Sequence, residues 1–71
     1  MIVRFTTRSE LNASVQGLAE SLDRFRERGD FIPPFTTRID GEEIVVDFEG
    51  EVLPRETVLY VTCQMVGLTR V

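Results

Sequence analysis

The sequence contains no histidine, no lysine and no tryptophan. Histidine is the commonest general base and metal ligand, and lysine supplies Schiff bases and the ammonium group of phosphate-binding loops. The five glycines form neither a GxGxxG nor a GxxxxGK[ST] pattern. These absences exclude most catalytic and nucleotide-binding arrangements, so we expect a protein that is not an enzyme and that binds no metal ion and no cofactor.

The sequence has one cysteine, Cys63, which cannot close a disulfide within the chain. Small secreted domains usually depend on several disulfides, so a reducing, cytoplasmic environment is expected. Cys63 falls in an apolar segment, where burial raises the pKa of a thiol, and we interpret it as a core residue rather than a nucleophile. No stretch reaches the roughly 20 apolar residues of a membrane span, and no signal peptide is recognisable, so no membrane partner is expected.

The 71 residues, of which 42% are hydrophobic and 28% charged, are enough for a single globular domain, residues 1–71. A chain of this size buries only about 60% of the surface that its unfolded form exposes. Its margin of stability is therefore small, and a partner or a second copy of the chain would add to it.

An amphipathic helix is expected after a first strand over residues 1–6. Its apolar residues recur at steps of three or four and share one face; they are Leu11, Val15, Leu18, Leu22 and Phe25. Thr7 and Glu10 have the spacing of a capping box, which predicts the start of the helix. Gly29, followed by Pro33 and Pro34, predicts its end.

Two further strands are expected after residue 34, where the apolar pattern changes to alternation. The dipeptide Asp40-Gly41 is favoured in two-residue hairpin loops, and with these residues as the loop Ile39 would face Glu42. Residues 57–65, TVLYVTCQM, are rich in β-branched side chains and predict a last strand. Gly67 would mark a bulge or the end of that strand.

The expected fold is α+β, in the order β-α-β-β-β, with one helix packed on one face of a four-stranded, mainly antiparallel sheet. The last three strands would form a meander, and the first strand would lie in parallel beside the fourth or, alternatively, beside the second. A single helix covers only one face of a sheet, so the other face would be open. That open face would carry Ile2, Arg4, Val45, Val58 and Tyr60.

The acidic residues gather in one region of the sequence. Residues 40–56 carry seven acidic residues and one arginine, whereas the rest of the chain carries five acidic residues and seven arginines. The net charge of −4 therefore combines a segment of charge −6 with a remainder of charge +2. Such asymmetry steers association with charged partners, although each single carboxylate can also be explained as a solubilising residue.

These patterns predict a non-catalytic, acidic binding protein. It would dock its acidic hairpin and open sheet face on a basic, nucleic-acid-binding protein surface and act as an inhibitor that mimics nucleic acid. In size and acidity it resembles small phage inhibitors of host nucleic-acid machinery, including anti-CRISPR proteins, which is a similarity of profile and not of sequence. The alternative is a structural or adaptor module that forms a homodimer or extends a partner's β-sheet.

The residues expected to contact the partner belong to the hairpin and to the open face. They are Glu42, Glu43, Val45, Asp47, Glu49, Glu51, Val58 and Tyr60. Direct binding of nucleic acid is not expected, because affinity for a duplex depends chiefly on basic side chains that neutralise phosphates.

Overall fold

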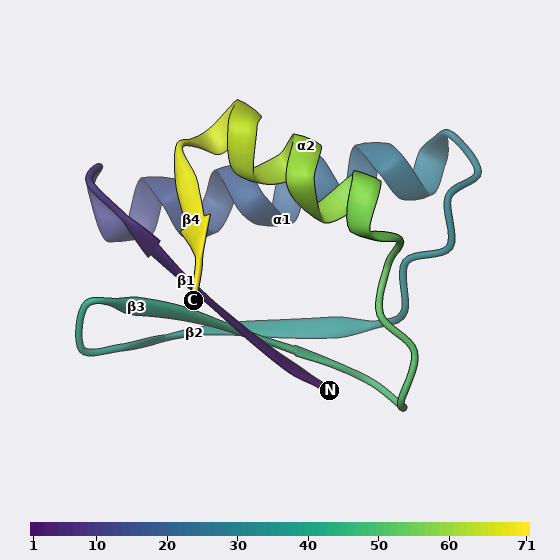
Figure 1. The fold of residues 1–71 in the computed structure, drawn as a ribbon, viewed down its shortest axis with the longest axis horizontal. Coiled ribbons are helices and arrows are strands. Elements are labelled where there is room, and N and C mark those ends of the chain that lie inside the picture. The colour runs from purple at the N-terminus through teal and green to yellow at the C-terminus, as the bar shows by residue number, and fades with distance from the viewer.

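The computed structural model describes all 71 residues, which form a four-stranded sheet with two helices on one of its faces (Figure 1). The elements are β1 (Ile2–Thr7), α1 (Leu11–Glu27), β2 (Phe35–Asp40), β3 (Glu43–Phe48), α2 (Glu56–Val66) and β4 (Leu68–Arg70). The strand order is β2-β3-β1-β4, and all neighbours are antiparallel. The expected α+β class, with four strands and a helix packed on the sheet, is confirmed. The element order is that of the ferredoxin-like motif, which hosts many unrelated functions and so assigns none.

The apolar stripe expected along the first helix is confirmed. Leu18 and Leu22 are completely buried in the core, and three more residues of the stripe pack against that core from partly buried positions, namely Leu11, Val15 and Phe25. The core lies between this helical face and the inner face of the sheet, where Phe5 and Phe48 are its largest buried side chains.

The helix starts three residues later than the Thr7 capping box predicted. Glu10 is the N-cap residue, and its carboxylate accepts hydrogen bonds from the backbone N–H groups of Asn12 (2.9 Å) and Ala13 (2.7 Å). These bonds stabilise the ionised carboxylate and lower the pKa of Glu10. The hydroxyl of Thr7 instead accepts a hydrogen bond from the backbone N–H of Ser9.

The end of α1 is held by its backbone and by one arginine. Gly29 has a φ of +97°, and the N–H groups of Gly29 and Asp30 bond to the carbonyls of Arg26 and Phe25, both at 3.1 Å. This is a Schellman motif, as the glycine predicted. The guanidinium group of Arg26 donates to the carbonyl of Ile32 at 3.1 and 3.2 Å, so this arginine ties the following loop to the helix.

The β2–β3 hairpin turns one residue later than predicted. Asp40 pairs with Glu43, so the loop consists of Gly41 and Glu42, and the expected pairing of Ile39 with Glu42 is wrong. Gly41 has a φ of +62°, in the left-handed region that glycine adopts most easily. The glycine, rather than the aspartate, is therefore the first residue of the two-residue loop.

The hairpin nevertheless keeps its predicted faces. Each β2 residue pairs two positions further along β3 than expected, and a shift of two positions leaves every side chain on the same face. Ile44, Val46 and Phe48 point into the core and are buried, as the alternation predicted.

Residues 57–65, expected to form the last strand, lie in α2. Val58, Leu59 and Thr62 are its buried residues, and this spacing belongs to a helix rather than to a strand. Gly67 has a φ of +72° and donates its N–H to the carbonyl of Cys63 at 2.9 Å, which ends the helix. The preference of β-branched residues for strands is weak, and packing against α1 and the sheet overrides it.

The reassignment of this segment changes the sheet. The fourth strand is the short β4, which pairs with β1 and not with β3, so the expected meander is wrong. The first strand does lie beside the last one, but it is antiparallel to it and occupies a central position between β3 and β4.

The two helices approach each other closely at Gly17. Ser14, Gly17 and Ser21 follow one line along α1, and both serines are buried. A Cβ atom placed on Gly17 would lie 3.1 Å from Cγ1 of Val66 in α2. Glycine at this position therefore sets the distance between the helices.

Candidate functional site

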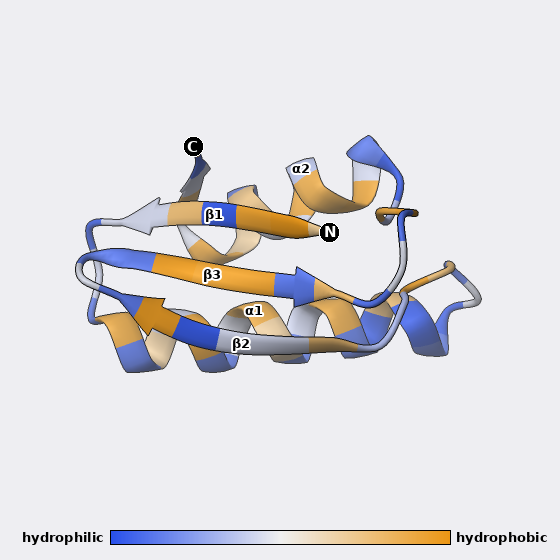
Figure 2. Ribbon diagram, turned by 90° about the horizontal axis from the view of Figure 1, so that it is seen from below, coloured by the Kyte–Doolittle hydropathy of each residue, from blue (hydrophilic) through white to orange (hydrophobic).

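The sheet face opposite the helices is not covered by any other part of the chain (Figure 2). Alternation along the paired strands assigns ten side chains to it: Ile2, Arg4, Thr6, Thr36, Arg38, Asp40, Glu43, Val45, Asp47 and Thr69. We call this surface the open face. It contains no aromatic residue, and its charged residues come from β1, β2 and β3.

Val45 occupies the centre of the open face but offers no apolar contact there. It is paired with Arg4 on one side and with Arg38 on the other, and it is only 1% exposed. We attribute this burial to the aliphatic stems of the two arginines, which cover apolar surface while their charged groups reach water. Val45, which the sequence placed among the partner-contacting residues, therefore has almost no surface of its own to offer.

Arg4 holds two carboxylates of the hairpin. Its Nη1 atom lies 3.1 Å from Oδ2 of Asp40 and 3.0 Å from Oε1 of Glu43, and hydrogen bonds to both raise the pKa of Arg4. Arg38 lies further away, at 3.9 Å from the same aspartate. Glu43 and Asp40 thus share one guanidinium group, and Glu43 is less available to a partner than the sequence suggested.

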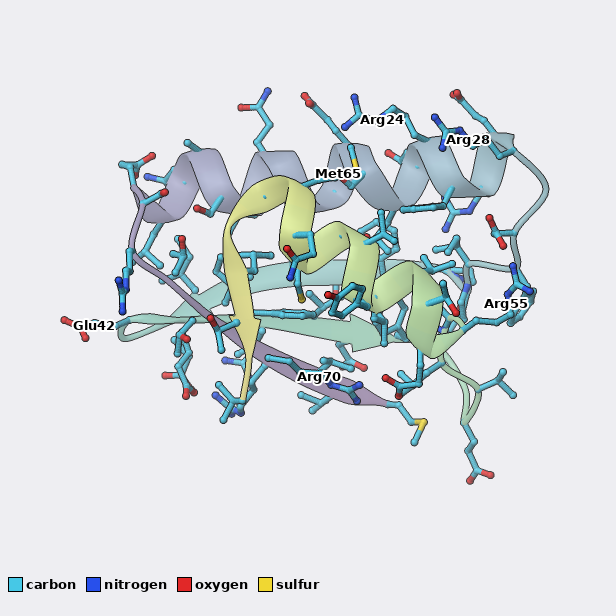
Figure 3. The ribbon with its side chains drawn as sticks, turned by 45° about the horizontal axis from the view of Figure 1, so that its top comes forward. Arg24, Arg28, Glu42, Arg55, Met65 and Arg70 are labelled. Atoms are coloured by element: carbon cyan, nitrogen blue, oxygen red, sulfur yellow. The ribbon has the colours of Figure 1, made fainter.

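Three carboxylates of the acidic region have no partner within the chain. Glu42, Glu49 and Glu51 take part in no ion pair and in no side-chain hydrogen bond. Glu42 lies at the tip of the β2–β3 hairpin and points away from the molecule (Figure 3). Glu49 lies at the opposite end of β3, where it borders a hollow of about 400 Å³ together with Asp47 and Thr36.

Asp47 keeps the place that the sequence predicted for it. It is exposed on the open face, opposite Thr36 of β2, and lies 3.9 Å from the amino group of Met1. With the three unpaired glutamates it completes an acidic set that reaches from the hairpin tip to the far end of β3. This set, Glu42, Asp47, Glu49 and Glu51, is the acidic part of the candidate site.

Two residues expected on the open face belong to the helical layer instead. Val58 is 3% exposed and forms part of the core, so it does not lie on the open face. Tyr60 is 65% exposed, but it lies on α2, where it borders a hollow of about 310 Å³ between α2 and β4. Both were assigned to the sheet because residues 57–65 were interpreted as a strand. The spacing of Val58, Thr62 and Val66, which ends at Gly67, was the signal that could have revealed the helix.

The chemistry available at the open face is that of carboxylates, guanidinium groups and hydroxyls. No group of three or more metal-ligating side chains comes together anywhere in the chain. Burial raises the pKa of the Cys63 thiol, which therefore stays protonated at neutral pH. Neither helix is both long and apolar enough to cross a membrane. The face itself carries three carboxylates and two guanidinium groups, so its excess of negative charge is small, and most of the negative charge of the candidate site lies at its borders, on Glu42, Glu49 and Glu51.

The open face also differs from the sheet surfaces that bind RNA. Domains that bind single-stranded RNA on a four-stranded sheet stack bases on aromatic side chains, and this face has none. The hairpin region carries six carboxylates, three of which lie on the open face. The face has only two arginines, Arg4 and Arg38, that could contact phosphates. Comparisons with protein-family models, with curated proteins and with solved structures found no match for this chain.

Proposed function

We propose that this protein is a non-catalytic binding protein that docks its open face and hairpin on a basic surface of another protein. The observation that carries this proposal is the set of unpaired carboxylates, Glu42, Glu49 and Glu51, beside a face with only two arginines. Basic protein surfaces commonly bind nucleic acid through its phosphates. The carboxylates would occupy the places of those phosphates, and the protein would act as a competitive inhibitor.

The division between paired and unpaired carboxylates supports this role. Asp40 and Glu43 are held by Arg4 within the chain, so they contribute to the shape of the hairpin. The unpaired glutamates remain hydrated and free to attract a cationic partner. Exposed charges of this kind act mainly on the association rate and on specificity, and salt screens them over about 10 Å at 0.1 M.

The proposal includes a cytoplasmic location, where Cys63 would remain a free thiol. Small phage inhibitors of nucleic-acid enzymes, of which anti-CRISPR proteins are one kind, would be an instance of such a function. The alternative role, a module that self-associates or extends another sheet, is supported by a separate observation at the edge of β4.

Two matched variants test the docking surface. Glu49→Gln with Glu51→Gln removes two charges from the acidic part of the candidate site, whereas Glu20→Gln with Glu27→Gln removes two from exposed positions on α1. The two proteins have the same net charge and differ only in where the charge was lost. A basic protein captured by the unaltered chain should bind the first variant with a roughly tenfold slower association rate and a weaker salt dependence.

The control variant should bind like the unaltered chain. Thermal unfolding of both variants should match that of the unaltered chain, because exposed charges contribute little to stability. Equal losses of association rate in the two variants would mean that only net charge matters, and the acidic part of the candidate site would not be the docking surface. Capture of no basic protein at all would contradict the proposed function itself.

A further inference from the structure

The outer edge of β4 has no partner strand. Val71, just after β4, donates its N–H to the carbonyl of Arg4 at 3.0 Å, which makes Arg4 and Val71 a hydrogen-bonded pair of the antiparallel ladder. Hydrogen-bonded and non-hydrogen-bonded pairs alternate along such a ladder. The backbone N–H and C=O groups of Leu68 and Arg70 therefore point away from β1. None of these groups forms a backbone hydrogen bond with a turn, a loop or a helix cap.

The other edge of the sheet, at β2, is protected in a way that β4 is not. Pro33 and Pro34 precede β2, and the strand carries the exposed charges of Arg38 and Asp40. Prolines and charged side chains are the usual features that prevent an edge strand from pairing with another chain. At β4 the charge of Arg70 is already compensated, because its Nη1 lies 3.0 Å from both carboxylate oxygens of Glu56.

A hollow with a partly apolar lining adjoins the free edge of β4. It measures about 310 Å³ and lies between α2 and β4, which run close together in Figure 3 with Arg70 beside them. Leu59, Cys63 and Leu68 contribute its apolar lining, and the exposed ring of Tyr60 stands at its border. A strand added to β4 would therefore gain apolar contacts from α2 as well as backbone hydrogen bonds.

The charges at this edge favour a second copy of this chain as the occupant. The protein has a net charge of −4, so two copies repel each other overall. Among the residues of β4 and the hollow, however, the only charged ones are Glu56 and Arg70, and they neutralise each other. Two acidic molecules can therefore approach through this edge without bringing unpaired charges together, and a two-fold axis makes such a surface complementary to itself.

We propose that two copies of the chain pair through β4, antiparallel to each other and centred on Thr69. The outward backbone groups of Leu68 in one copy would then meet those of Arg70 in the other. The result is a continuous eight-stranded sheet, in which α2 of each copy packs beside α2 of the other. This inference does not rest on the docking function, although a dimer would present two open faces on the same side of one sheet.

Cross-linking tests this geometry directly. Centred pairing places Thr69 opposite its counterpart at a non-hydrogen-bonded position, with Cα atoms about 4.5 Å apart, within the roughly 4.4–6.8 Å that a disulfide spans. Thr69→Cys in a Cys63→Ala background should form covalent dimers within minutes of mild oxidation at micromolar concentration. Thr36→Cys in the same background is the control, since Thr36 is an exposed threonine on the open face of the other edge strand, β2. Equal cross-linking of the two variants would overturn the proposed interface.

Sedimentation equilibrium supplies a test without cysteine chemistry. The unaltered chain, of 8.1 kDa, should sediment as a dimer at both 0.1 M and 0.5 M salt, because the interface contains no net charge. Tyr60→Glu should weaken the dimer at least tenfold, whereas Phe31→Glu should not, although the two aromatic residues are 65% and 66% exposed. A chain that is monomeric at every concentration, or a dimer that Tyr60→Glu leaves intact, would overturn the proposal. A monomer whose β4 edge binds another protein would do so as well.

The dimer and the docking function fail in different ways. Glu49→Gln with Glu51→Gln should slow binding to a basic partner and leave the dimer unchanged. Tyr60→Glu should dissociate the dimer and leave the charges of the open face in place. Loss of one behaviour without the other therefore shows which of the two inferences is wrong.

Discussion

The contact between Gly17 and Val66 offers a sharp test of the helical layer. Gly17 lies in the middle of α1, where alanine would stabilise the helix by about 1 kcal/mol through its higher helix propensity. The added Cβ atom, however, would lie 3.1 Å from Cγ1 and 3.7 Å from Cγ2 of Val66. Valine in a helix has one strongly preferred rotamer, so it cannot easily turn aside. Crowding of this kind typically costs about 1–3 kcal/mol, which cancels or exceeds the gain in propensity.

Gly17→Ala should therefore have different effects in two backgrounds. In the unaltered chain it should be neutral or destabilising, because the gain in propensity and the crowding oppose each other. In a Val66→Ala background the crowding is removed, and the same substitution should stabilise the fold by about 1 kcal/mol. The double-mutant cycle should thus report a coupling of about 1 kcal/mol or more between two residues that are 49 positions apart in the sequence.

Urea unfolding followed by circular dichroism measures these free energies, provided that the slope with denaturant is the same for all four proteins. Gln16, the exposed residue before Gly17, provides the calibration: the difference between Gln16→Ala and Gln16→Gly gives the propensity term in this helix. If Gly17→Ala stabilises both backgrounds by that same amount, α2 does not pack on α1 at this point. The helical assignment of residues 56–66 would then have to be revised.

Three further predictions concern the turn, the core and the N-cap. Gly41→Val should destabilise the fold by about 1–2 kcal/mol, and Gly41→Asn by clearly less, because no atom lies near the added Cβ and only the left-handed backbone opposes it; equal thermal shifts would contradict the observed turn. Leu22→Ala should cost about 2–5 kcal/mol or unfold the domain, seen as a loss of amide dispersion in NMR spectra, and native-like spectra and stability would exclude Leu22 from the core. The pKa of Glu10 is lower in the folded chain than in the unfolded one. The stability that the ionised cap contributes is therefore present above the unfolded pKa and is lost as the pH falls through the folded pKa. Glu10→Gln should therefore be less stable than the unaltered chain at pH 7, and the difference should vanish toward pH 2; a difference independent of pH would refute the cap.

The parts of the fold that could be predicted are those with strong local signals. The helix over residues 11–27 has a stripe of five apolar residues and is followed by a glycine and two prolines. Both signals are local, because they depend only on residues within the helix or just after it. The hairpin was predicted with its correct faces because alternation has a period of two and survives a shift of two positions. The exact turn was missed because two overlapping dipeptides, Asp40-Gly41 and Gly41-Glu42, can both form a two-residue loop.

The candidate site was predicted only in part, for the same kind of reason. That Asp47 and Val45 lie on the open face follows from alternation within β3. The pairing of Arg4 with Asp40 and Glu43 joins residues from β1 and the hairpin, and nothing local in the sequence indicates that these strands are neighbours. Which carboxylates remain unpaired is thus a property of the sheet order.

The sequence by itself determined the class of this protein: a small α+β domain with a long amphipathic helix, an acidic hairpin and a chemistry limited to carboxylates, arginines and hydroxyls. Tertiary structure decided the secondary structure of residues 56–66. Their β-branched side chains favour a strand, but their apolar spacing also fits a helix. Local preferences differ by only about 1 kcal/mol, whereas burying Val58, Leu59 and Thr62 between α1 and the sheet involves many contacts at once. Because residues 56–66 form a helix, only the short β4 remains to pair as the fourth strand. It pairs with β1, which therefore lies inside the sheet, and the outer edge of β4 is left without a partner strand.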